Sequence, residues 1–291
     1  MGALVSLLPA RATVAVVLGL MALSLDTRQI LRAFARPTPV ALALVISFGI
    51  LPFAGWALGN WLLQEDLRIG LQVATSVPCT MAAAIIWTRM GGGNEAVALL
   101  ITLLTSGLSW MTTTAWLTCT TAAEVKLDAG ELMLTLVLTL IVPVGLGQLL
   151  RAPASLRGLA DRWKPALSVL AQLLVLVIIL QAVVLASRSV GSSLQAQLGQ
   201  LALVSALCLA IHLLGLGAGY YGGFVLGLPA DERIAAAIAG SQKTLPVSLV
   251  LITSYFSAFP LAVVPILVYH IGQLVLDSLV IECWARQRGA G

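Results

Sequence analysis

The stretch Gly240-Ser241-Gln242-Lys243-Thr244-Leu245-Pro246 lies inside a run that is otherwise apolar enough to cross a membrane. A lysine at the centre of a membrane costs about 2.5–3.5 kcal/mol on insertion scales, so such a residue usually faces a cavity or another polar group. Pro246 removes a backbone donor, and inside lipid only protein groups or cavity water can compensate for that loss. Interrupted membrane helices of this kind form the substrate sites of many secondary transporters, and the stretch therefore predicts a transporter.

The composition predicts an all-α polytopic membrane protein. Of the 291 residues 59% are hydrophobic and 10% are charged, and the mean hydropathy is +1.02. At roughly 20 residues per span, we expect about nine transmembrane helices, at residues 8–25, 38–63, 67–89, 95–119, 131–151, 166–187, 197–221, 232–256 and 259–284. The four cysteines lack the spacing of a metal site, and basic patches interleaved with aromatic residues are absent, so we expect no metal, no cofactor and no nucleic-acid partner.

The basic residues predict the orientation, because cytoplasmic loops carry an excess of lysine and arginine. Eleven follow odd-numbered spans, namely Arg28, Arg32, Arg36, Arg89, Arg151, Arg157, Arg162, Lys164, Arg233, Arg286 and Arg288. The other side has only Arg11, Arg68, Lys126 and Arg188. We therefore expect an integral protein of the plasma (inner) membrane, with its N-terminus outside and its C-terminus in the cytoplasm.

Each half of the chain contains one polar, interrupted span. We treat 1–291 as a single transmembrane domain whose N-terminal half (about 1–150) and C-terminal half (about 166–291) are joined by a polar connection. The first break is Thr75-Ser76-Val77-Pro78-Cys79-Thr80, and the second is the lysine stretch. Matching interruptions in two halves are typical of inverted repeats whose breaks cross at the binding site. A proline kink in a packed helix is the alternative explanation of the first break.

Several short motifs carry a resemblance to a known family. They are Gly92-Gly93-Asn94-Glu95-Ala96, Val142-Pro143 with Gly147-Gln148, Pro229-Ala230-Asp231, Gly240 to Thr244, and Pro265 to His270 with Gln273. With them the chain resembles the bile acid:sodium symporter family, closest to the branch of the seventh member of solute carrier family 10 and its bacterial relatives. The resemblance covers nearly the whole chain.

The resemblance implies two groups of helices and two crossing broken helices. Members commonly have ten spans, and the resemblance implies that this chain lacks the first of them. A panel domain would comprise spans 8–25 and 131–187, and a core domain would comprise spans 38–119 and 197–284. The third and eighth spans would be unwound where they cross.

The sodium sites of coupled relatives are largely missing. By resemblance, a Ser-Asn pair falls on Ala83 and Ala84, a serine on Ala98 and a glutamate on Ile238, so that only Thr102 survives at the first site. At the second site Gln242 matches, but its neighbour is Lys243 in place of asparagine. We hypothesise that the lysine charge takes the role of sodium, which predicts sodium-independent transport, with proton coupling as one option. A lysine that snorkels or pairs with a carbonyl for structural reasons is the alternative.

Other polar residues have two interpretations each. Glu95 favours the positive end of a helix, or alternatively pairs with Lys243. His270 and Gln273 share a helical face, which suits a polar cavity or a structural histidine equally. His212 is expected to be structural, and Asp277 either pairs with a basic loop residue or carries protons.

A stripe of hydroxyls follows the first break. Thr102, Thr105 and Ser109 recur along one helix face, where they either bond their own helix or line a cavity, and we favour the cavity. The full candidate set for substrate and ion binding is Pro78, Cys79, Thr80, Glu95, Thr102, Thr105, Ser241, Gln242, Lys243, Thr244, His270 and Gln273.

We predict a secondary transporter of a small organic anion that works by alternating access in the lipid bilayer. The alternatives are a non-transporting membrane regulator of ion homeostasis and a sodium-coupled symporter with rebuilt sites. An enzyme is not expected, because the sequence has no HExxH motif, phosphate loop or catalytic triad pattern.

Overall fold

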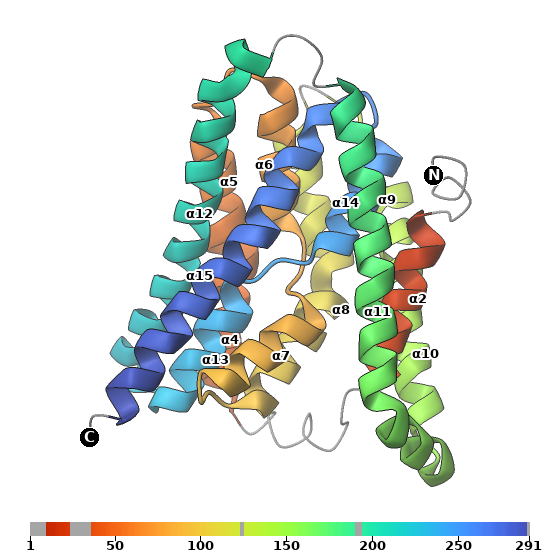
Figure 1. Ribbon diagram of the computed structural model, residues 1–291, viewed down its shortest axis with the longest axis vertical. Helices are drawn as coiled ribbons and strands as arrows, with labels where there is room; N and C mark the ends of the chain where they lie inside the picture. Colours follow the sequence, from red (N-terminus) through yellow and green to blue (C-terminus); the bar gives the residue numbers. More distant parts are fainter. Residues whose placement is uncertain (1–9, 24–35, 123–124, 190–193, 290–291) are drawn as a thin grey trace.

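The computed structural model describes residues 10–23, 36–122, 125–189 and 194–289, and within these ranges every regular element is a helix (Figure 1). The prediction of an all-α polytopic membrane protein is confirmed. The elements in chain order are α2 (Ala10–Leu23), α4 (Pro37–Val45), η1 (Ile46–Ile50), α5 (Leu51–Gly59), α6 (Glu65–Ser76), α7 (Met81–Met90), α8 (Glu95–Thr120), α9 (Ala129–Leu136), η2 (Val137–Ile141), α10 (Val142–Arg151), α11 (Ala154–Ser189), α12 (Leu194–Val225), α13 (Ala230–Ser241), α14 (Leu245–Tyr255), η3 (Pro260–Ala262) and α15 (Val263–Gly289).

The count of nine membrane spans is not confirmed. Seven segments of the described chain are long and apolar enough to cross a membrane, and the bent pair α6–α7 makes eight. Helix α2 has 14 residues, fewer than the roughly 20 that a span needs. The ends of the predicted span 8–25, together with Arg28 and Arg32, lie outside the described residues.

The polar connection predicted at residues 151–165 is helical instead. Helix α10 ends at Arg151 and α11 begins at Ala154, so that Pro165 lies inside a helix of 36 residues. The connection is rich in alanine, leucine and arginine, which are good helix formers even where the segment is polar. Arg151 is buried there and donates to Leu23 O at 2.8 Å.

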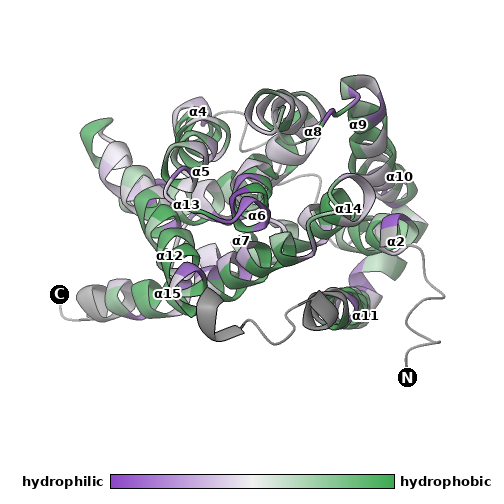
Figure 2. Ribbon diagram, turned by 90° about the horizontal axis from the view of Figure 1, so that it is seen from above, coloured by the Kyte–Doolittle hydropathy of each residue, from purple (hydrophilic) through white to green (hydrophobic). Residues whose placement is uncertain are grey.

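Helices α2, α10 and α11 stand together at one side of the molecule (Figure 1). Helix α2 packs against α10 and α11, while α12 packs against α13 and α15, and α13 also packs against α4 and α8. Seen from above, the broken segments α6, α7, α13 and α14 lie toward the middle of the bundle (Figure 2). Helix α12 approaches α13 so closely that a Cβ on Gly219 would overlap the backbone of Ala237.

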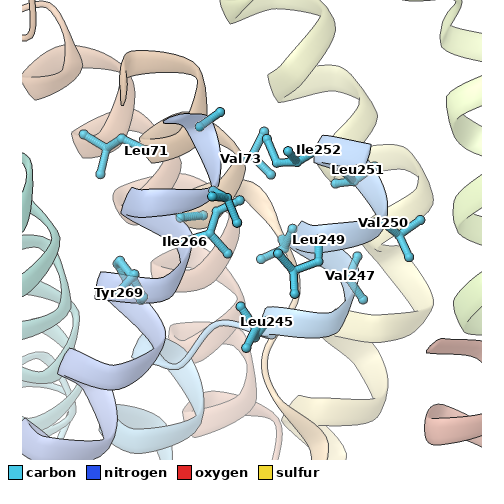
Figure 3. Close-up of a cluster of buried hydrophobic side chains, with 14 of the residues drawn as sticks. Leu71, Val73, Leu245, Val247, Leu249, Val250, Leu251, Ile252, Ile266 and Tyr269 are labelled. Carbon is cyan, nitrogen blue, oxygen red and sulfur yellow. The ribbon is translucent and has the colours of Figure 1, made fainter. Parts of the chain in front are cut away.

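An apolar core holds the second half of the second broken span, helix α14. Leu245 and Leu249 of α14 pack with Ile266 of α15 and Leu71 of α6, all buried (Figure 3). Residues 234–252, which include the break, are all buried inside the protein. Its backbone is therefore shielded from lipid, which is the condition under which a non-helical break is tolerated at membrane depth.

Candidate functional site

Two helix breaks meet at the centre of the protein. Helix α6 ends at Ser76 and α7 begins at Met81, with a bend of 65° between them. Helix α13 ends at Ser241 and α14 begins at Leu245. The amide N–H of Thr244 donates to Pro78 O at 3.0 Å, which joins the second break to the first. The prediction of two broken, crossing helices is confirmed.

The side chain of Gln273 on α15 fixes the second break. Its Oε1 accepts from the Lys243 amide N–H at 2.8 Å, and its Nε2 donates to Lys243 O at 3.0 Å. Both backbone groups of an unwound residue are thus paired, as burial requires. His270 Nδ1 lies 3.0 Å from the same Nε2, so the shared helical face predicted for His270 and Gln273 is observed.

The Lys243 ammonium is held by oxygens of two other spans. Its Nζ donates to Ser47 O at 2.6 Å, to Ser47 Oγ at 3.0 Å and to Val77 O at 2.9 Å. The side chain is 3% exposed, with the Phe48 ring centroid 5.8 Å from Nζ. Lys243 therefore does not snorkel to the membrane surface. It pairs with backbone carbonyls, as the structural alternative also allowed.

The chain makes the Ser47 carbonyl available through Pro52. In the π-helical turn η1, the Leu51 amide N–H donates to Ile46 O. The next residue, Pro52, has no N–H, so the turn cannot continue this pattern with a donor to Ser47 O. Lys243 binds Ser47 O, and Trp116 Nε1 donates to Phe48 O at 2.6 Å.

A second buried polar cluster lies against the end of α13. His212 Nε2 is 2.9 Å from Asp277 Oδ1, and Gln242 Nε2 donates to Asp277 Oδ2 at 2.5 Å. Both His212 Nδ1, at 3.3 Å, and Tyr269 OH, at 3.1 Å, face Ser241 O. The partners of Asp277 are thus His212 and Gln242, and the expectation that it pairs with a basic loop residue is wrong.

A cavity of about 410 Å³ lies on the other side of the breaks, between them and the helices α2 and α11. Its polar wall is made by Thr80, Thr244, His270 and Gln172. Thr80 and Thr244 are the N-cap positions of α7 and α14, and neither side chain caps its own helix. The remaining walls are mainly apolar, from Leu18, Met21, Met81, Ala82, Ala83, Ile86, Trp87, Val175, Leu176, Ile179, Pro246 and Leu274.

Several predicted site residues lie away from this cavity. Thr102 and Ser109 are fully buried and donate to carbonyls of their own helix, Leu99 O at 2.8 Å and Ser106 O at 2.7 Å. Thr105 does the same and also accepts from Cys79 N at 3.4 Å. The preference for cavity lining is therefore wrong, because the break packs on this face.

Glu95 also lies elsewhere. It forms an ion pair with Arg89, with 2.8 Å between Oε2 and Nη2, at the turn between α7 and α8. A pair between Glu95 and Lys243, the alternative weighed from the sequence, is therefore not formed. Asn94 caps α8 by accepting from Val97 N at 3.3 Å.

Three of the positions that match sodium ligands, Ala84, Ala98 and Ile238, are buried among apolar side chains. Ala84 and Ala98 are buried together with Ala235, Ala236 and Ala239. Ile238 is buried in a neighbouring cluster. Methyl groups offer a cation no ligand atoms. The side chains around these positions are apolar too, so they do not replace the missing oxygens.

The sequence reasoning missed Ser47 and Tyr269 and did not join His212 to Asp277. The only local sign of Ser47 is Pro52, five residues later in an apolar run. The sign of the His212–Asp277 pair was the presence of one ionisable residue in each of two separate membrane spans.

Comparison with known proteins gives matches to membrane transporters. The SBF-like CPA transporter family matches residues 4–286. The chain is 28% identical over 242 residues to the probable sodium/metabolite cotransporter BASS4, chloroplastic, of Arabidopsis thaliana, which covers 78% of this chain and 54% of the relative. It is 25% identical over 242 residues to sodium/bile acid cotransporter 7 of Danio rerio, covering 80% and 69%, and 23% identical over 295 residues to that of Mus musculus, covering 92% and 82%. The chain thus spans just over half the length of the plant relatives.

Proposed function

Because the chain belongs to the SBF-like CPA transporter family, whose members are transporters and not enzymes, we propose that it is a secondary transporter that carries a small organic anion by alternating access. The observation that carries this proposal is the cavity of about 410 Å³ that borders both helix breaks. A volume of this size suits a small organic molecule, since ligand pockets measure roughly 300–1,000 Å³.

The chemistry of the cavity walls supports an anion with an apolar body. Thr80, Met81, Ala82 and Ala83 place the first turn of α7 in the wall. The first N–H groups of a helix have no intrahelical acceptor, and this end of the helix dipole is positive. A carboxylate or sulfonate bound there would accept from these groups and from the Thr80 hydroxyl, while its apolar part would contact Leu18, Val175 and Leu176.

Lys243 supports a sodium-independent mechanism. Its ammonium has three oxygens around it, one of them Val77 O at the C-terminal end of α6, where the helix dipole is negative. A bound cation would take the same oxygens, so the tethered ammonium substitutes for it. These relatives are named sodium/metabolite and sodium/bile acid cotransporters, and we propose that this chain differs from them in its coupling ion.

The helix packing supports a rocking movement. Helices α2, α10 and α11 pack on one another, and α2 and α11 form one wall of the cavity. The breaks with α7 and α15 form the other wall. Movement of the first group, the panel, against the remainder, the core, would open the cavity to either side. The proposed location is the plasma membrane, with the N-terminus outside.

Reconstituted vesicles test the proposal. Purified protein is placed in liposomes loaded with cholate or with smaller alkyl and aryl carboxylates, and counterflow of the same labelled anion is measured in choline and in sodium buffer. Counterflow of at least one anion, equal in the two buffers, is expected. Ala83→Leu, which narrows the cavity beside the first turn of α7, should abolish it, whereas Ala115→Leu on an exposed face of α8 should not. Counterflow that survives Ala83→Leu, or that requires sodium, would contradict the proposal.

A further inference from the structure

We infer that the buried pair His212–Asp277 is a proton-binding site, and that its proton is the ion that this carrier couples to its substrate. The inference rests on the proposed transport function and assigns its driving ion. The pair lies in the membrane interior on α12 and α15, and both side chains are 0% exposed. Ionisable residues in such positions are costly and commonly belong to ion pathways or proton relays.

The contacts of the pair determine how many protons it holds. His212 Nδ1 lies 3.3 Å from Ser241 O, a carbonyl that can only accept, so a hydrogen bond between these two atoms requires a hydrogen on Nδ1. His212 Nε2 faces Asp277 Oδ1, and one further hydrogen is required between these two atoms. The pair is therefore either imidazolium with carboxylate or neutral imidazole with carboxylic acid. Both forms contain one proton more than neutral histidine with an ionised aspartate, and both have no net charge.

Loss of that proton to water breaks one of the two contacts. If the remaining hydrogen stays on Nδ1, the Nε2 lone pair faces the Asp277 carboxylate. If it stays on Nε2, the Nδ1 lone pair faces Ser241 O. Each arrangement sets two acceptors against each other in a dry site, where unpaired polar groups are costly.

The second helix break is directly attached to the pair. Ser241 is the last residue of α13, and its carbonyl also accepts from Tyr269 OH at 3.1 Å. Asp277 Oδ2 accepts from the Gln242 side chain, whose Oε1 is buried without a hydrogen-bond partner in the described residues. Gln242 thus positions the Asp277 carboxylate, and we do not propose it as a ligand of a bound ion. A change of protonation alters the bonds of Ser241 and Gln242, the residues at which the helix unwinds.

Among the described residues, no other titratable side chain is hydrogen-bonded to His212 or Asp277. The titratable groups nearest to it are Tyr269 on α15, Cys208 on α12, and Lys243 and Cys79 in the two breaks. Lys243 is bound to Ser47 and Val77 rather than to Asp277. The full burial of the pair means that the proton is occluded in this conformation and exchanges with water only in another, as coupled transport requires.

Nitrogen NMR of labelled histidine tests proton binding without any substrate. The chain has only two histidines, so ¹⁵N-histidine protein in lipid bilayers gives signals of His212 and His270 alone, assigned by loss of one set in His270→Asn. Over the pH range in which the protein stays folded, the His212 signals should change in one step. Asp277→Asn should remove the step, and Glu131→Gln, an exposed carboxylate control, should keep it. His212 signals that do not change over this range would overturn the inference.

Transport driven by a pH gradient tests coupling. With one proton per monovalent anion, one unit of pH across the vesicle supports accumulation up to about tenfold. Wild-type protein and Glu131→Gln should reach this accumulation, and Asp277→Asn should only equilibrate the anion. Counterflow without accumulation in the wild type would refute proton coupling and leave the transport proposal standing. Absence of counterflow in the wild type would refute transport itself, and the NMR result would then be judged alone.

Discussion

The ammonium of Lys243 is the group whose removal best separates a tethered cation from a bound sodium ion. Lys243→Ala removes the three bonds of Nζ and leaves Ser47 O and Val77 O without that donor. We expect the variant to fold with reduced stability, and to recover part of it when sodium or ammonium ions are supplied. Wild-type protein should not respond to sodium, because its ammonium already fills the position.

The expected loss follows from three contributions. Each buried acceptor left unpaired costs about 1–3 kcal/mol, and the space left by the lysine stem adds a cavity cost that for large-to-alanine changes reaches about 2–5 kcal/mol. Relief of the buried charge offsets several kcal/mol of this sum. We therefore expect a net loss of about 2–4 kcal/mol in choline buffer. Lys243→Met, which keeps most of the stem, should lose less.

Thermal unfolding of detergent-purified protein measures both effects. A ligand that binds only the folded state at ten times its Kd stabilises it by about 1.4 kcal/mol. The Tm of Lys243→Ala should rise in sodium or ammonium chloride relative to choline chloride, while the Tm of the wild type stays constant. Lys126→Ala, at an exposed lysine, is the control and should behave as the wild type in every salt.

Three results would count against this reasoning. If sodium raises the Tm of the wild type, the protein binds sodium at another place and the alanine cluster around Ala84 and Ala98 does not exclude it. If Lys243→Ala is as stable as Lys126→Ala in choline buffer, the three oxygen contacts contribute nothing and no cation site exists there. Loss of stability without any response to added ions would reduce Lys243 to a structural group.

Three further predictions follow from local contacts. Gly219→Ala should destabilise the protein by about 1–3 kcal/mol, since its Cβ meets the backbone of Ala237, while Gly217→Ala on the same helix, where no described atom lies within 4 Å, should be neutral or slightly stabilising, as read by Tm. Gln273→Leu should cost about 2–4 kcal/mol in chemical unfolding, because two backbone groups of Lys243 lose their partner. Glu95→Gln should change the Tm little and leave counterflow intact, since its ion pair with Arg89 is largely exposed and worth about 0–1 kcal/mol; a large loss of counterflow would instead place Glu95 in the site.

The sequence was sufficient to predict the helical class and the position of both breaks. These features depend on local chemistry: proline removes a donor, and a polar residue in an apolar run has to be shielded from lipid. The breaks at Val77–Thr80 and Gln242–Thr244 were therefore recognisable from a few neighbouring residues each. The division into panel and core stays a prediction.

The surroundings of each polar group could not be predicted in the same way. Ser47 binds Lys243 across 196 positions of sequence, and His212 meets Asp277 across 65. Which carbonyl lacks its helical donor depends on the π-helical turn before Pro52, and only packing decides which side chain reaches it. For the same reason Thr102, Thr105 and Ser109 were wrongly predicted to line a cavity. Their spacing shows that they share one helix face, but not which part of the protein packs on that face.

The charges of the centre suggest why proton and anion would move together. With Lys243 as an ammonium and the His212–Asp277 pair protonated, the centre has one positive charge, which a bound monovalent anion neutralises. Without the anion, loss of the proton makes the pair negative and again balances Lys243. The states with both ligands or with neither are neutral, whereas a state with only one carries an uncompensated buried charge that costs several kcal/mol. The neutral states are the ones able to rearrange inside the membrane. Transport should therefore be electroneutral, and an imposed membrane potential should not change the accumulation that a pH gradient supports; a potential that does change it would show that the two charges are not balanced in this way.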